Sequence, residues 1–213
     1  MASGLGYSIL IVVLLLSPWT VRIAFSNPLL LLALILQTVL LNLIHKKRNP
    51  KISFLLFLLL IISVLLYLPQ SFDLSLFVHT PEEIFKINQR RQYYDNLTGR
   101  LFQNKLSLSV NKFETNLFQI LDPNMYFFAS HPRERVGVKE FSKFHFLFIP
   151  IFLIGFFSLI KDTSKTIFIY AFFTIAISTL VKNSAYLGPV FVFPLIVSVL
   201  YIGTCRLILR NET

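Results

Sequence analysis

The chain has 213 residues, 55% of them hydrophobic, and its mean hydropathy of +0.69 lies well above that of an ordinary soluble domain. This composition excludes a typical soluble enzyme and predicts a membrane protein. The net charge of +10 does not indicate nucleic-acid binding, because residues 70–145 carry ten Lys or Arg against eight Asp or Glu. The remaining excess lies in short connectors and at the ends of apolar runs, a distribution typical of membrane topology. The single cysteine, Cys205, excludes an intrachain disulfide.

Three apolar runs in residues 1–69 are predicted to cross the membrane. They cover residues 5–25, 28–44 and 52–69, close to the length of about 20 residues that a helix needs to span a bilayer. We expect the first run to be a retained span rather than a cleaved signal sequence, because no Lys or Arg precedes it and no small-residue cleavage site follows. Pro18, near its far end, suits a kink.

The second run contains three polar residues, Gln37, Thr38 and Asn42. We expect them to hydrogen-bond to neighbouring helices, as polar side chains in membrane bundles do. The alternative is a transport path, which the absence of any ionisable residue in the middle of a predicted span argues against.

The connector between the second and third runs sets the predicted orientation. Residues 45–51 contain four Lys or Arg and no acid, which by the positive-inside rule places them in the cytoplasm. Both termini are then cytoplasmic, and residues 70–143 lie on the outer side of the membrane. For a bacterial protein this membrane would be the plasma membrane.

Residues 70–143 are the only soluble-like segment, and they are predicted to form a pair of short amphipathic helices. The sequence from Thr80 to Glu83 matches a capping box with proline at the first helical position, so a helix is predicted from Pro81 to about Asp95. The pair is too small to bury a core alone, and we expect it to lie on the membrane surface or on the spans. A second helix is indicated by one apolar stripe at intervals of three or four residues: Phe102, Leu106, Val110, Phe113, Leu117 and Leu121.

Residues 144–213 are predicted to form three further spans and a short cytoplasmic tail. The spans cover residues 144–160, 166–181 and about 187–205. The predicted fold is therefore an all-α membrane protein of about six transmembrane helices, with the extracytoplasmic helix pair between the third and fourth spans.

The densest group of ionisable side chains lies in residues 121–145, directly before the fourth span. Arg133 and Arg135, with His131 beside them, supply cations at the headgroup region, where arginine binds a phosphate in bidentate fashion. These three residues are the predicted lipid-phosphate site, and the alternative is that Arg133 forms a juxtamembrane ion pair with Glu134 or Glu140.

Two carboxylates are the candidates for a general base. Asp73 follows the third span and Asp122 precedes the fourth, so either is placed to take a proton from a hydroxyl on a substrate presented from the lipid side. An alternative stays open for Asp122, because it can instead cap a local turn with Asn124.

The sequence predicts no metal and no cofactor. His79, His131 and His145 lack the spacing of metal ligands. There is also no glycine-rich phosphate loop and no Gly-x-Ser-x-Gly motif.

A resemblance covers roughly Thr80 to Leu207. Outer amphipathic helices, then the aromatic and charged residues 122–138, then apolar runs containing Gly155, Pro194 and Gly203, resemble the late part of bacterial polyprenyl-phosphate-dependent glycosyltransferases of the GT-C, protein-mannosyltransferase-like type. The resemblance implies a polyprenyl-phosphate sugar bound at the outer face and transfer of the sugar to an acceptor there. Such enzymes carry their catalytic acid in a large first outer loop, whereas residues 22–27 are short and contain no acid.

Two functions are therefore predicted as alternatives. The first is a truncated membrane glycosyltransferase, or a subunit that needs a membrane-protein partner to supply the missing half. The second is a non-catalytic membrane scaffold whose outer helices bind a partner. The lipid bilayer is a predicted partner under both, and nucleic acid under neither.

Overall fold

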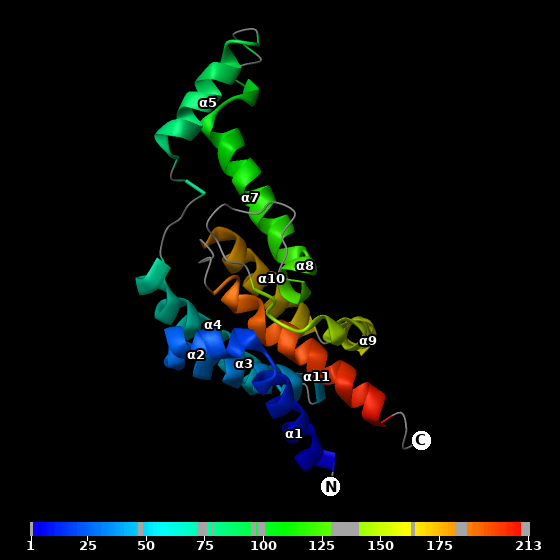
Figure 1. Cartoon of the computed structure of the whole chain (residues 1–213). Coiled ribbons are helices and arrows are strands. Elements are labelled where there is room, and N and C mark those ends of the chain that lie inside the picture. The colour runs from blue at the N-terminus through cyan, green and yellow to red at the C-terminus, as the bar shows by residue number, and fades with distance from the viewer. Residues whose placement is uncertain are drawn as a thin grey trace.

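The longer apolar helices pack into a bundle, and a helical hairpin projects from one end of it (Figure 1). The computed structural model describes residues 2–46, 49–71, 76–77, 79–94, 97, 101–128, 141–162, 165–181 and 187–209. The bundle consists of α1 (Ala2–Leu15), α2 (Pro18–Ser26), α3 (Pro28–Lys46), α4 (Pro50–Ser71), η1 (Phe146–Phe148), α9 (Ile149–Asp162), α10 (Lys165–Leu180), η2 (Val190–Val192) and α11 (Phe193–Leu209). The hairpin consists of α5 (Pro81–Arg91) and α7 (Lys105–Leu121), and the short helix α8 (Asn124–Phe127) follows it. The described residues form helices and no strands, which confirms the prediction of an all-α fold.

The predicted number of six membrane spans is confirmed only in part. Within the described residues, three helices are long and apolar enough to cross a membrane: Pro28–His45, Pro50–Tyr67 and Val190–Ile208. The apolar helices Phe146–Lys161 and Lys165–Leu180 are shorter. A helix of 16 residues, such as α10, rises only about 24 Å, against a hydrocarbon core of about 30 Å.

The first predicted span, residues 5–25, is broken into α1 and α2. The two helices meet at an angle of 77° and count as a fourth span only if the bent pair is taken as one. Ser17 lies between them with φ −89° and ψ 115°, the extended conformation that a residue before proline prefers. Pro18 then starts α2 at its first turn, where the missing N–H costs nothing. The kink expected at Pro18 is therefore a sharp turn, and α2 runs across the direction of α1.

Helix α1 begins and α11 ends at the same end of the bundle. In Figure 1, α1 begins and α11 ends at the end of the molecule away from α5.

Asn27 fixes the turn between α2 and α3. Its Oδ1 accepts a hydrogen bond from Leu30 N at 3.0 Å, and its Nδ2 donates to Leu66 O of α4 at 3.3 Å.

A buried polar network joins α3, α4 and α10. Tyr170 Oη donates to Gln37 Oε1 at 2.6 Å, and Gln37 Nε2 donates to Ser63 Oγ at 2.6 Å. The prediction that Gln37 hydrogen-bonds to neighbouring helices is confirmed. It is wrong for Thr38, whose hydroxyl donates to Leu34 O in its own helix. It is also wrong for Asn42, whose buried amide atoms have no hydrogen-bond partner in the part of the chain that the structure describes.

Glycines allow α9 and α11 to pack with their backbones in contact. A Cβ on Gly155 would lie 1.9 Å from Val199 O, and a Cβ on Gly203 would lie 2.1 Å from Ile151 O. Small residues at such a crossing are typical of membrane helix pairs, in which close packing rather than the hydrophobic effect holds the helices together.

Candidate functional site

The α5–α7 hairpin is held by contacts at both ends of α5. The predicted capping box is present: Glu83 N donates to Thr80 Oγ1 at 3.3 Å, and Thr80 N donates to Glu83 Oε2 at 2.9 Å. Lys112 Nζ of α7 donates to the same Glu83 carboxylate at 2.8 Å. At the other end of α5, Arg91 Nε donates to Gln103 O at 2.5 Å. These contacts join α5 to α7 and to the residues directly before α7.

The boundaries of both helices differ from the prediction. Helix α5 ends at Arg91 rather than at about Asp95. Helix α7 begins at Lys105, behind a second capping box in which Ser107 N donates to Asn104 Oδ1 at 2.7 Å. The signal that sequence reasoning missed is Asn104 followed three residues later by Ser107.

Acidification should loosen the hairpin. Burial alone would raise the pKa of Glu83, but the hydrogen bonds from Lys112 and Thr80 N and the nearby charges outweigh it and lower the pKa below its ordinary value of 4.5. A carboxyl with a lowered folded-state pKa stabilises the fold above its unfolded pKa, and this contribution is lost as the pH falls through the folded value. We therefore expect proteolysis between α5 and α7 to accelerate as the pH falls below the ordinary Glu83 value of 4.5. In Lys112→Ala the acceleration should be smaller, and an equal acceleration in both proteins would contradict the assignment to this pair.

The hairpin extends beyond the bundle rather than lying along it (Figure 1). Only the C-terminal part of α7 packs on the bundle, where Asn116 Nδ2 donates to Thr179 O of α10 at 3.2 Å. The structure places α5 and the N-terminal part of α7 off the bundle (Figure 1), and the alternative that the pair lies on the membrane surface stays a prediction. Because α7 contacts the bundle through its C-terminal part, α5 and the N-terminal part of α7 lie away from the bundle.

The predicted apolar stripe of α7 is exposed. Phe102 and Leu106 are each 71% exposed, and Val110 is 54% exposed. The tip of the hairpin adds further large side chains, of which Tyr93 is 79% and Leu97 is 72% exposed. The periodicity thus identified an apolar face, and because Leu117 is half-buried while the residues above are exposed, α5 and the bundle leave most of this face uncovered.

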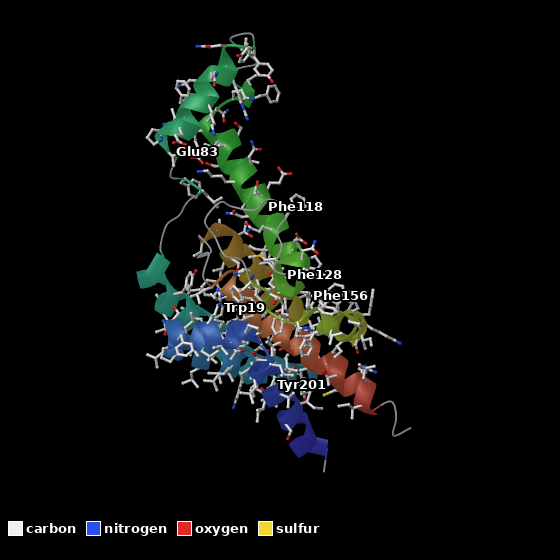
Figure 2. All side chains as sticks on the ribbon, viewed as in Figure 1. Trp19, Glu83, Phe118, Phe128, Phe156 and Tyr201 are labelled. Atoms are coloured by element: carbon white, nitrogen blue, oxygen red, sulfur yellow. The ribbon has the colours of Figure 1, made fainter. Side chains whose placement is uncertain are left out.

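Trp19 forms the centre of an aromatic cluster that ties α2 to the segments around the hairpin base (Figure 2). The Trp19 side chain is fully buried, and its ring centroid lies 5.3 Å from that of Phe193, 5.9 Å from that of Tyr126 and 6.1 Å from that of Phe144. Its Nε1 donates to Leu187 O at 2.5 Å. One side chain therefore contacts α8, the segment before η1 and the segment that leads into α11.

Lys143 is buried beside this cluster, with only 5% of its surface exposed. Its Nζ donates to Met125 O at 2.8 Å and lies 5.1 Å from the centre of the Phe141 ring, a distance at which a cation is attracted to an aromatic face. Gly188 lies against it with φ +68°, and a Cβ there would be 2.8 Å from Lys143 Cε. In the sequence Lys143 lies in the charged stretch before the fourth predicted span, and nothing in that stretch predicts that its side chain is buried.

Of the predicted site residues, the structure describes Asp122 alone. Its Oδ1 accepts a hydrogen bond from Asn124 N at 2.9 Å, which makes it the cap of a local turn at the end of α7. The buried Tyr126 lies close by, and its hydroxyl donates to Ile120 O at 2.7 Å. Burial, assisted by the charge of Asp122, raises the pKa of Tyr126 above its ordinary value of 10.0. Asp73, His131, Arg133 and Arg135 lie outside the described residues.

A groove of about 300 Å³ lies at the bend between α1 and α2. It is lined by apolar side chains and Thr20, and Asp122 is not among its residues. Among the described residues, no three His, Cys, Asp or Glu side chains gather as a metal site would require. This groove is apolar, and the exposed surface that the described residues offer to a partner lies on the hairpin.

The fold belongs to the class of helical proteins with several apolar helices of membrane-spanning length, for which a lipid bilayer is the expected environment. Comparison with family models, with curated proteins and with solved structures found no match for this chain.

Proposed function

We propose that this chain is a multi-pass membrane protein that holds the α5–α7 hairpin outside the membrane and binds a partner with it, without catalytic activity of its own. The observation that carries the proposal is the exposed apolar face of a hairpin that extends beyond the bundle. A monomeric protein in water seldom exposes a large contiguous apolar patch unless the patch is a binding surface.

The topology proposed for this function has six crossings and cytoplasmic termini. The short helices α9 and α10 would cross a locally thinned bilayer, at a cost of a fraction of a kcal/mol per Å of mismatch, by order of magnitude. The position of the start of α1 and the end of α11 at the end of the molecule away from α5 supports an even number of crossings. The basic residues 45–51 support a cytoplasmic location for that end.

The glycosyltransferase alternative depends on residues of the predicted lipid-phosphate site and on a carboxylate base. The hydrogen bond from Asn124 N to Asp122 Oδ1 favours a local structural role for Asp122, but one oxygen of the carboxylate can still accept a proton. A direct assay therefore has to separate the two functions.

The experiment combines a photo-crosslinker with a transfer assay. A photoreactive residue at Phe102, which is 71% exposed, should form an adduct in native membranes, whereas the same residue at the exposed Glu82, at the start of α5, should not. The purified protein should transfer no sugar from a polyprenyl-phosphate donor. Transfer that is abolished by Arg133→Ala with Arg135→Ala, or equal adduct formation at Phe102 and Glu82, would overturn the proposal.

A further inference from the structure

The tip of the hairpin combines exposed apolar side chains with cations. The apolar set consists of Tyr93, Tyr94, Leu97, Leu101 and Phe102, each more than half exposed. Residues 85–106 contain five Lys or Arg and a single acid, so the net charge of this segment is +4 (5 − 1). Among the described cations, Arg90 and Lys105 are exposed on either side of the tip. We call this group of exposed side chains the tip surface.

This combination of side chains matches the interface of a lipid bilayer. Tyrosine is enriched where membranes meet water, because its ring enters the apolar region while its hydroxyl stays in water. Lys and Arg next to apolar side chains are attracted to the negative surface of anionic lipids. The acids of the hairpin that the structure describes, Glu82, Glu83 and Glu114, lie outside the tip segment. The charge of the tip surface is therefore complementary to an anionic surface.

The length of α7 carries the tip surface away from the bundle. Helix α7 has 17 residues and is about 25 Å long, and its C-terminal part contacts α10 through Asn116 and Thr179. The tip lies at the other end of α7, away from the bundle (Figure 1). The contacts of Arg91 with Gln103 and of Lys112 with Glu83 hold the two helices in this arrangement.

We propose that the tip surface binds the interface of a second, anionic lipid bilayer that faces the protein. The proposal rests on the proposed function and names the partner: the chain is anchored in one membrane by its bundle and contacts another through its hairpin. The aromatic and leucine side chains enter the headgroup region of the second bilayer, and the cations around them neutralise its phosphates.

The test uses the full chain in nanodiscs of neutral lipid. The nanodiscs are mixed with vesicles of neutral phosphatidylcholine alone or with vesicles that also contain roughly 30% phosphatidylglycerol, an anionic lipid that attracts basic segments. Flotation should recover the nanodiscs with the anionic vesicles, and with the neutral vesicles far less. Arg90→Gln with Lys105→Gln should weaken binding about 25-fold, because each cation at an anionic surface contributes about fivefold. Leu97→Ser and Phe102→Ser should each weaken it about tenfold or more. Phe118→Ser, at an exposed position on the C-terminal part of α7 outside the apolar stripe, is the matched control and should bind as the native chain does.

A dye whose fluorescence rises in lipid, attached at the exposed Asn88 through Asn88→Cys in a Cys205→Ser background, identifies which bilayer the tip enters. Its signal should rise when anionic vesicles are added. A rise in fluorescence in anionic nanodiscs without vesicles would show that the tip inserts into the protein's own bilayer, and this would overturn the proposal. Clustering of nanodiscs without vesicles would also overturn it. Absence of vesicle binding together with a protein adduct at Phe102 would overturn this proposal and leave the proposed function standing, whereas sugar transfer would overturn the proposed function itself.

Discussion

Replacing Gly155 with alanine should disrupt the packing of α9 on α11. The added Cβ would lie 1.9 Å from Val199 O and 2.9 Å from Gly203 N, and both of these atoms belong to the backbone of α11, so no side-chain rotation relieves the clash. The helices must move apart and lose the contacts along their crossing. Overpacking of this kind costs about 3 kcal/mol or more, and a leucine at the same position should cost more than alanine. The thermal unfolding midpoint of the detergent-solubilised protein measures the effect.

The same loss is expected for Gly203→Ala, because a Cβ there would lie 2.1 Å from Ile151 O. Phe157→Ala is the matched control on α9, since Phe157 is 66% exposed and substitutions at such positions usually change stability by less than about 0.5 kcal/mol. A double variant of both glycines should lose little beyond either single one, because each alone already separates the helices. Native-like midpoints for both single alanine variants would show that α9 and α11 do not approach this closely.

Local features of the fold could be predicted from the sequence. The capping box of α5 needs only Thr80 and Glu83, three residues apart, and the structure contains both of its hydrogen bonds. Helix α3 was predicted at residues 28–44 and extends from Pro28 to Lys46, a difference of two residues at one end. Short-range signals sufficed here because the interactions that define these elements form within a single helical turn.

The bend between α1 and α2 shows where such reasoning ends. Pro18 indicates an interruption of the helix, but the angle of 77° is set by contacts with distant parts of the chain. Ser17 Oγ donates to Lys143 O at 2.9 Å, and Trp19 Nε1 donates to Leu187 O. Nothing near Pro18 in the sequence reveals these partners.

The sequence predicts which residues form the apolar face of the candidate site, but it does not predict whether those residues are exposed or buried. The interval of three or four residues identifies the apolar face of α7, yet the same pattern fits a helix that is packed on a bundle, lies on a membrane or faces water. Lys143 shows the opposite limit: a lysine in a charged stretch is expected to be exposed, and its burial depends on Met125, Phe141 and Gly188 closing around it. In both cases the tertiary contacts decide which surface is available to a partner.

Replacing Trp19 with alanine should destabilise the hairpin end of the bundle more than any other truncation of an aromatic side chain. The Trp19 side chain is fully buried, and it contacts rings from α8, from the segment before η1 and from α11. Its removal leaves a cavity among these rings and removes the hydrogen bond from Nε1 to Leu187 O. Truncation of a buried tryptophan lowers the free energy of unfolding by about 3–5 kcal/mol. This range includes the contribution of the lost hydrogen bond. Thermal unfolding followed by circular dichroism measures the loss.

Trp19→Phe separates the two contributions, because phenylalanine keeps an aromatic ring and lacks the N–H group. Its loss of stability should be intermediate, since the hydrogen bond to Leu187 O is lost, at a cost of about 0.5–1.5 kcal/mol, while most of the ring contacts remain. Opening of the cluster should also expose residues 141–148, whose attachment depends on Phe144 packing against Trp19, so chymotrypsin should cleave after Phe144 faster in Trp19→Ala than in the native chain. A Trp19→Ala protein that unfolds at the native temperature and resists cleavage there would show that α2 does not anchor the base of the hairpin, and the outward position of α5 and α7 would then need another cause.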